Sequence, residues 1–156
     1  MTIDPSPARA HDPGDDPGER SPVLPRDNAQ VAGFRAFQRF ERGLATGDWS
    51  GFVALLSDDF SFQFPAGKWR GRFQGKEKAR EFFEYVAAVF PKGLRLTLDR
   101  AHYGETTCVF EFHDWGEMVL PGQEPRPYKN LVAISIDLRG EEVVSYREYF
   151  GSDGQP

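Results

Sequence analysis

Two long runs of alternating apolar and polar residues, separated by a short turn at Arg139-Gly140, constrain this chain most strongly. Together they cover residues 128–150. Alternation of this kind is typical of half-buried strands, and a loop this short forces the two strands to lie antiparallel. The sequence therefore predicts a long β-hairpin that packs one face against the core.

The two faces of the predicted hairpin differ in composition. If Arg139 and Gly140 lie at the centre of a four-residue loop, one face is apolar near the turn and gains amide and carboxylate groups at the far end. This face carries Asn130, Val132, Ile134, Ile136, Val144, Tyr146, Glu148 and Phe150. The opposite face carries the mixed set Leu131, Ala133, Ser135, Val143, Ser145, Arg147 and Tyr149. The first face predicts a lined pocket, and the second suits solvent or the interface of a homodimer.

The composition is that of an ordinary globular domain with an acidic balance. At 156 residues, the chain has the length of one domain with a substantial core. A net charge of −5 and interspersed basic residues argue against a nucleic-acid partner. No apolar run approaches the roughly 20 residues that span a bilayer, so we expect no membrane partner. One cysteine and the lack of an apolar leader segment favour a cytoplasmic protein.

Helical spacing of apolar residues recurs in three segments. It predicts a helix over residues 28–46, a short helix that Asp48 caps, and a helix over residues 76–90 that Pro91 ends. Residues 1–27 are rich in proline and aspartate and poor in large apolar side chains. Such a segment cannot offset the entropy of ordering, so we predict a disordered tail.

Further strands surround the third helix. They are predicted over residues 60–64, 94–98 and 108–115, in addition to the two arms of the hairpin. Asp58-Asp59 interrupts the pattern before the first of them, and Pro65-Ala66-Gly67 stops it. The order predicts an α+β domain over residues 28–151, in which helices cover one face of a curved antiparallel sheet. Residues 152–156 are predicted to be a C-terminal tail.

Several segments resemble a known family. They are Phe37-Gln38-Arg39-Phe40, Gly47-Asp48, Val53-Ala54-Leu55-Leu56, Asp58-Asp59 and Pro65-Ala66-Gly67 near the start, and Val143-Val144-Ser145-Tyr146-Arg147 and Phe150-Gly151 at the end. These segments resemble the opening and the last strand of bacterial ketosteroid isomerases. The chain is thus similar to the superfamily of nuclear transport factor two, which includes SnoaL-like polyketide cyclases and limonene epoxide hydrolases. The resemblance implies a cone-shaped α+β fold with an internal apolar pocket.

The resemblance does not extend to the isomerase chemistry itself. The position of the isomerases' oxyanion-donating tyrosine holds Phe40, that of their aspartate base holds Phe64, and their second aspartate falls in the apolar stretch near Val132. Enolisation needs a base and hydrogen-bond donors for the oxyanion, and phenylalanine supplies neither. We therefore expect this chain not to be a ketosteroid isomerase proper.

SnoaL-like cyclases resemble the chain at a different position, because they carry an acid/base carboxylate near that of Glu148. Burial between Tyr146 and Phe150 would raise the pKa of Glu148 toward neutrality, whereas an arginine at the pocket rim would make it a structural ion-pair partner. Asp114 joins the same face in the simplest hairpin register, but a one-residue slip moves it outward. The Asp-Arg-Asp set of epoxide hydrolases fits less well, because Arg147 should point to the other face.

The candidate catalytic residues are thus Glu148 and Asp114. Candidate ligand-contacting residues are Asn130, Tyr146, Phe40, Phe64, Phe110, Phe112 and Val132. Asn130 either orients a ligand carbonyl or hydrogen-bonds Glu148. His113 alternates with outward residues and is assigned to the surface or an interface, and Cys108 is assigned to packing. No spacing is typical of a metal site, and we expect no metal or other cofactor.

Two hypotheses of different kinds follow. The chain is either a small enzyme that transfers a proton on an apolar or carbonyl-bearing molecule, or a non-catalytic ligand-binding or dimeric assembly module. A solvent-shielded Glu148 beside an open cavity favours the enzyme. A cavity filled by Phe40, Phe64 and Phe110 favours the module.

Overall fold

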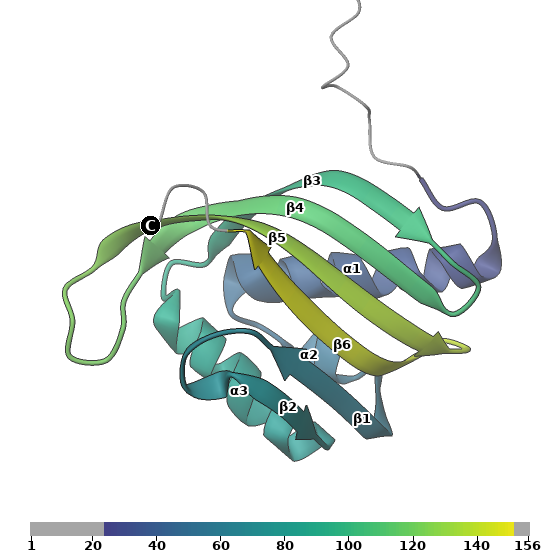
Figure 1. Cartoon of the computed structure of the whole chain (residues 1–156), viewed down its shortest axis with the longest axis horizontal. Coiled ribbons are helices and arrows are strands. Elements are labelled where there is room, and N and C mark those ends of the chain that lie inside the picture. The colour runs from purple at the N-terminus through teal and green to yellow at the C-terminus, as the bar shows by residue number, and fades with distance from the viewer. Residues whose placement is uncertain (1–23, 152–156) are drawn as a thin grey trace, which may run out of the picture.

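A computed structural model describes residues 24–151 and contains a six-stranded curved sheet with three helices (Figure 1). The elements in chain order are α1 (Asn28–Thr46), α2 (Ser50–Val53), β1 (Leu56–Phe64), the 3-10 turn η1 (Gly67–Trp69), β2 (Gly71–Gln74), α3 (Lys76–Val89), β3 (Leu94–Tyr103), β4 (Thr107–Met118), β5 (Arg126–Arg139) and β6 (Glu142–Gly151). The predicted C-terminal tail and most of the predicted N-terminal tail lie outside the described residues.

The strands follow the order β2-β1-β6-β5-β4-β3 across the sheet. All neighbouring pairs are antiparallel except β1 and β6, which run parallel. Figure 1 shows the sheet curving over α1 and α3, so the helices cover its concave face. The predicted α+β architecture is confirmed. None of the helices in residues 24–151 is long and apolar enough to cross a membrane.

The first helix begins and ends where its sequence predicts. The Asp27 side chain accepts a hydrogen bond from the Gln30 backbone N–H at 2.8 Å and caps the first turn. At the other end, Gly47 adopts a left-handed conformation with φ of 76° and donates its N–H to the Gly43 carbonyl. Between these caps, one stripe of the helix is buried against the sheet, and Phe37 and Phe40 lie in it.

The hairpin between β5 and β6 has the predicted inner face along most of its length. Ile134 pairs with Glu148 and Ile136 with Tyr146. Near the turn the prediction was wrong, because the turn lies at Gly140-Glu141 and the register shifts by a bulge between Asp137 and Leu138. The bulge moves Val143 to the inner face, where it is fully buried, in place of Val144.

The first strand is longer than its sequence pattern predicts. The strand was expected to begin at Phe60, after Asp58-Asp59 ended the preceding helical pattern, but β1 begins at Leu56 and runs through both aspartates. The two carboxylates stay exposed, and Arg139 pairs with both oxygens of Asp59 at 3.0 and 3.1 Å. These hydrogen bonds lower the pKa of Asp59. Acidic residues are compatible with this strand because their side chains remain in water.

Aromatic side chains form most of the core between the sheet and the helices. Phe52, Phe60 and Phe110 have no exposed surface, and Phe82 and Phe83 of α3 are each 1% exposed. Their rings meet in stacked and edge-on pairs, with centroids of Phe52 and Phe83 at 5.4 Å. Such rings bury large apolar areas, which stabilises the fold and fixes the walls of the space beneath the sheet.

Candidate functional site

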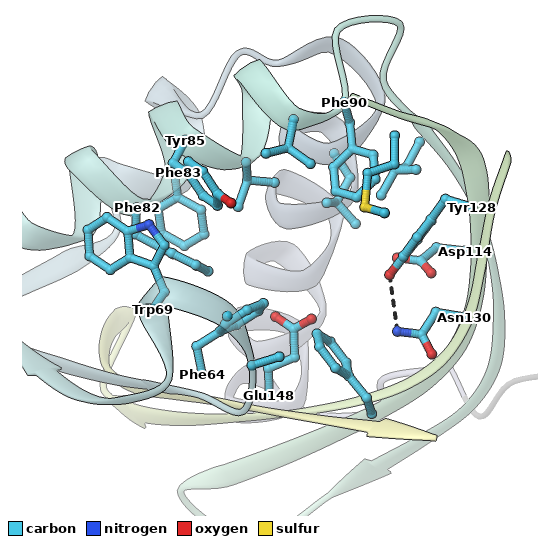
Figure 2. A pocket seen from close by; sticks show the side chains of 18 of the residues that line it. Phe64, Trp69, Phe82, Phe83, Tyr85, Phe90, Asp114, Tyr128, Asn130 and Glu148 are labelled. Carbon is cyan, nitrogen blue, oxygen red and sulfur yellow. Dashed lines mark hydrogen bonds between the residues drawn. The ribbon is translucent and has the colours of Figure 1, made fainter. Parts of the chain in front are cut away.

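A cavity of about 210 Å³ lies between α3 and the concave face of the sheet (Figure 2). Its walls are mainly aromatic and aliphatic, and a few polar groups interrupt them. The lining residues are Phe40, Leu44, Trp49, Phe64, Ala66, Gly67, Lys68, Trp69, Phe82, Phe83, Tyr85, Val86, Val89, Phe90, Leu94, Phe112, Asp114, Met118, Leu120, Tyr128, Asn130, Tyr146, Glu148 and Phe150. Apolar walls with a few converging polar groups are typical of small-molecule sites.

Glu148 points into this cavity from β6 (Figure 2). Its carboxylate Oε2 accepts a hydrogen bond from the Tyr146 hydroxyl, two residues earlier on the same face. Among residues 24–151, no lysine, arginine or histidine forms an ion pair with Glu148. Tyr146 is fully buried. The carboxyl group therefore has a neutral donor in place of a cation.

A cluster of three polar side chains lies on the other side of the cavity and consists of Asp114, Tyr128 and Asn130 (Figure 2). The register of β4 and β5 places Asp114 directly opposite Asn130 on the inner face, so the simpler of the two registers considered for Asp114 is confirmed. Asn130 Nδ2 donates to the Tyr128 hydroxyl at 3.1 Å, and its Oδ1 accepts from the Leu131 N–H at 2.9 Å. The Tyr128 side chain also favours the ionised form of Asp114 and so opposes the rise of its pKa.

The Asp114 carboxyl is only 4% exposed and incompletely satisfied. No described residue forms a hydrogen bond with its Oδ1. Buried carboxylate oxygens without donors are rare, because desolvation costs free energy that a hydrogen bond would recover. A ligand group in the cavity is one way to satisfy this oxygen.

Burial raises the pKa of both carboxyl groups. Desolvation raises the pKa of Glu148 to about 8; the hydrogen bond from Tyr146 opposes this rise, and the charge of Asp114 adds to it. Desolvation likewise raises the pKa of Asp114 to about 7, and the Tyr128 hydroxyl opposes this rise. Two carboxyl groups that titrate near neutrality can each hold or release a proton at ordinary pH.

Comparisons with known proteins identify the family to which the chain belongs. The family model of the SnoaL-like domain matches residues 37–146, which include most of the cavity lining. The chain belongs to the SnoaL-like family. A crystal structure of an NTF2-like protein from Anabaena variabilis ATCC 29413 is 48% identical to this SnoaL-like chain, with a TM-score of 0.73, over 81% of this chain and 92% of that one. The search of curated proteins found no match.

Two more distant crystal structures share the fold. A candidate SnoaL-like polyketide cyclase from Jannaschia sp. CCS1 is 16% identical, with a TM-score of 0.66, over 85% of this chain and 90% of its own. A candidate polyketide cyclase from Xanthomonas campestris is 19% identical, with a TM-score of 0.63, over 80% of this chain and 93% of its own. At these identities the likeness concerns the fold of the SnoaL-like domain.

Most of the residues predicted to contact a ligand line the cavity of the SnoaL-like domain. Glu148, Asp114, Asn130, Tyr146, Phe40, Phe64 and Phe112 all do so. Phe110 and Val132 are buried but lie outside the lining. Phe110 is covered by Phe37 of α1 at a centroid distance of 4.5 Å, and the short Val132 is flanked by Phe112 and Phe150 on the adjacent strands.

Sequence reasoning missed several residues of the site. Tyr128 was treated only as the start of a strand, yet its hydroxyl accepts a hydrogen bond from Asn130 and its side chain affects the pKa of Asp114. Its position two residues before Asn130 on an alternating strand was the available signal. Trp69 and Phe90 also line the cavity, one from the turn after β1 and the other from the end of α3.

The other reactive side chains lie away from the cavity. His113 lies on the outer face of β4, where its Nδ1 contacts Asp99 and its side chain is 41% exposed. Cys108 is buried against Gly33 of α1, and burial raises the pKa of its thiol to about 11, so it is a packed thiol. Arg147 points outward as predicted and pairs with Asp137 at 2.9 Å.

Proposed function

We propose that this SnoaL-like protein binds a small apolar or carbonyl-bearing molecule in the cavity and catalyses a proton transfer on it, with Glu148 as acid and base. One observation carries the proposal. Glu148 lines an aromatic cavity with a tyrosine hydroxyl, and no described cation, as its partner. A carboxyl group in this setting keeps its proton to higher pH than usual, which suits general acid–base chemistry near neutrality.

The supported reaction is proton removal from a carbon next to a carbonyl, followed by proton return. Glu148 takes the proton, so a C–H bond breaks and an O–H bond forms, while the electron pair moves onto the carbonyl oxygen. The Tyr128 hydroxyl, which lines the cavity beside Asp114, is the donor that we assign to that oxygen. Return of the proton from Glu148 to carbon closes the cycle. Return of the proton to a different carbon of a conjugated enolate would give an isomer. Attack of the enolate carbon on a second carbonyl of the ligand, with the proton of Glu148 passing to that carbonyl's oxygen, would close a ring.

The size of the cavity limits the ligand. For comparison, an engineered apolar cavity of about 150 Å³ in another protein binds benzene. The present 210 Å³ therefore suits a molecule of one or two rings better than a four-ring steroid. This limit agrees with the absence of the isomerase groups at Phe40 and Phe64.

The open space also favours the enzyme over a module with a filled cavity. Phe40 and Phe64 lie in the wall and leave the centre free, and Phe110 packs elsewhere. Glu148 is partly buried rather than exposed. An open cavity lined by an inward Glu148 supports the enzyme over the module.

Hydrogen–deuterium exchange on a small ketone tests the proposed reaction. We expect the protein in D₂O at pD 8 to accelerate exchange of the α-protons of 2-tetralone, followed by NMR, because Glu148 can take and return a proton. Glu148→Gln should lower the catalysed rate at least about 100-fold, the usual contribution of general acid–base catalysis. Glu124→Gln, in the exposed loop before β5, is the matched control and should exchange like the wild type. Equal catalysis by Glu148→Gln and wild type would contradict the role of Glu148.

A second candidate function, assembly through the outer face of the sheet, is favoured by exposed apolar side chains there. Trp115, Leu131 and Tyr149 form this outer-face patch and are 37%, 42% and 49% exposed. They lie on three adjacent strands, β4, β5 and β6. Apolar side chains grouped on a sheet face are typical of protein–protein contacts, and a second copy of the chain presents the same patch.

Measurement of molecular mass tests this assembly. We expect sedimentation equilibrium to give the mass of a dimer for the wild type and of a monomer for Leu131→Arg, because a charge at the centre of the patch would be desolvated on pairing. Val31→Arg is the control, since Val31 is 41% exposed but lies on α1. A monomeric wild type would contradict the homodimer. A dimer without any exchange activity would favour the module over the enzyme.

A further inference from the structure

Charge is distributed unevenly around the cavity. Two carboxyl groups, Asp114 and Glu148, line it, and Lys68 is the only cationic side chain among the described lining residues. Lys68 is exposed, and its Nζ lies 4.1 Å from the centroid of the Tyr85 ring. The polar groups that face the two carboxyls are Tyr128, Asn130 and Tyr146, none of which carries a positive charge. Among the described residues, the two carboxyl groups of the cavity therefore have no cationic side chain beside them.

The two carboxyl groups differ in what their neighbours provide. Glu148 accepts a hydrogen bond from Tyr146, whereas the Asp114 Oδ1 has no hydrogen-bond partner among residues 24–151. Asp114 is also buried, with only 4% of its surface exposed to solvent. A donor brought by a ligand would satisfy Oδ1, and a donor with a positive charge would also offset the desolvation of an ionised carboxylate.

The aromatic wall can bind a positive charge as well. The ring centroids of Phe90 and Tyr128 are 4.9 Å apart, and Tyr128 lies beside the Asp114 carboxyl. The rings of Phe64 and Phe150 meet edge-on, with their centroids 5.2 Å apart. Ring faces attract ammonium groups through their quadrupole, more strongly where water is excluded. At the rim, Tyr85 and Trp69 already have lysine ammonium groups over their rings, at 4.1 and 5.6 Å.

From this arrangement we infer that the natural ligand carries a protonated amine, which binds Asp114 in the aromatic cavity while Glu148 performs the proton transfer. The inference rests on the proposed function for the site and narrows its substrate class to small ring compounds with a basic nitrogen. An N–H of the ammonium group donates to Asp114 Oδ1, and the rings enclose the rest of the molecule. The charge of the ligand also favours the ionised form of Asp114, because the ion pair replaces a desolvated lone charge.

Binding of two probes of similar shape and different charge tests this inference by calorimetry on the full chain. 2-Aminoindane is a cation at pH 8, and indan-2-ol is its neutral counterpart with a single O–H donor. We expect 2-aminoindane to bind at least ten-fold more tightly at pH 8. We also expect this preference to shrink as the pH falls to 5.5, because Asp114 takes up a proton that competes with the ligand.

Asp114→Asn should remove the preference, so that the two probes bind within about two-fold of each other. Glu124→Gln should keep it, since that residue lies in an exposed loop. Equal binding of both probes by the wild type, or a preference that survives Asp114→Asn, would overturn the amine while leaving a neutral ligand and the proposed reaction standing. If neither probe binds, both the amine and the use of this cavity as a ligand site are contradicted. The pH dependence of the preference between the two probes, measured on the wild type, tests the role of Asp114 without any variant.

Discussion

Replacing Phe52 with alanine is expected to lower the free energy of unfolding by about 3–5 kcal/mol, the usual cost of deleting a buried ring. Phe52 has no exposed surface and does not line the cavity. Its ring lies 5.8 Å from Phe40, 5.4 Å from Phe83 and 6.4 Å from Tyr146, between centroids. All three neighbours do line the cavity, so the loss of Phe52 removes support from behind the site. Urea denaturation measures the change.

Phe73→Ala is the matched comparison for this core substitution. Phe73 lies on the edge strand β2, is partly exposed, and contacts Phe62 and Trp69 at 5.2 Å. We expect a loss of about 1–2 kcal/mol, because the ring buries less area and water can fill the space. An equal loss at both positions would contradict the view that the helices and the inner face of the sheet enclose one continuous core.

Replacing Glu148 with glutamine is expected to stabilise the protein at pH 8 and to change its stability little at pH 4. The pKa of Glu148 is raised to about 8 in the folded state, above its ordinary value of 4.5. Below pH 4.5 both states hold the proton, so the carboxyl carries no penalty. Between these values the unfolded chain releases the proton and the folded chain keeps it, so stability falls by up to about 1.4 kcal/mol per pH unit.

Glutamine keeps the shape and still accepts from Tyr146, but it does not titrate. The free energy of unfolding of the variant should therefore exceed that of the wild type by roughly 3–4 kcal/mol more at pH 8 than at pH 5. Glu124→Gln should follow the wild type at every pH. A variant that is clearly less stable than the wild type at pH 8 would mean that Glu148 is an ionised structural partner.

The sequence predicted the inner face of β6 from Tyr146 to Phe150, and that of β5 from Asn130 to Ile136, because the period of two is uninterrupted there. The failure at Val143 and Val144 has a local cause. Both residues are valine, so the alternation looks the same in either register, and the bulge after Asp137 that decides between them leaves no mark in the pattern. The inward direction of Asp114 stayed open for a related reason, since only the pairing of β4 with β5 fixes it.

The composition of the site was less predictable than the direction of its side chains. Phe110 and Phe112 both point inward from β4, but α1 covers the first and leaves the second at the cavity. Which side chain a helix covers depends on packing that no strand pattern records. The role of Tyr128 is likewise a result of cross-strand placement, because its partner Asp114 is on β4 while Tyr128 is on β5.

The ionisation of Glu148 in the folded protein is the most direct test of the proposed acid–base role. Carbon-detected NMR of protein labelled at the side-chain carboxyl carbons, titrated from pH 4 to pH 10, follows Glu148 and Asp114 separately. We predict that Glu148 is half-ionised near pH 8 and that Asp114→Asn lowers this pKa, because the charge of Asp114 helps to raise it. A Glu148 that is half-ionised near its ordinary pKa of 4.5 in the folded state would contradict the proposed role.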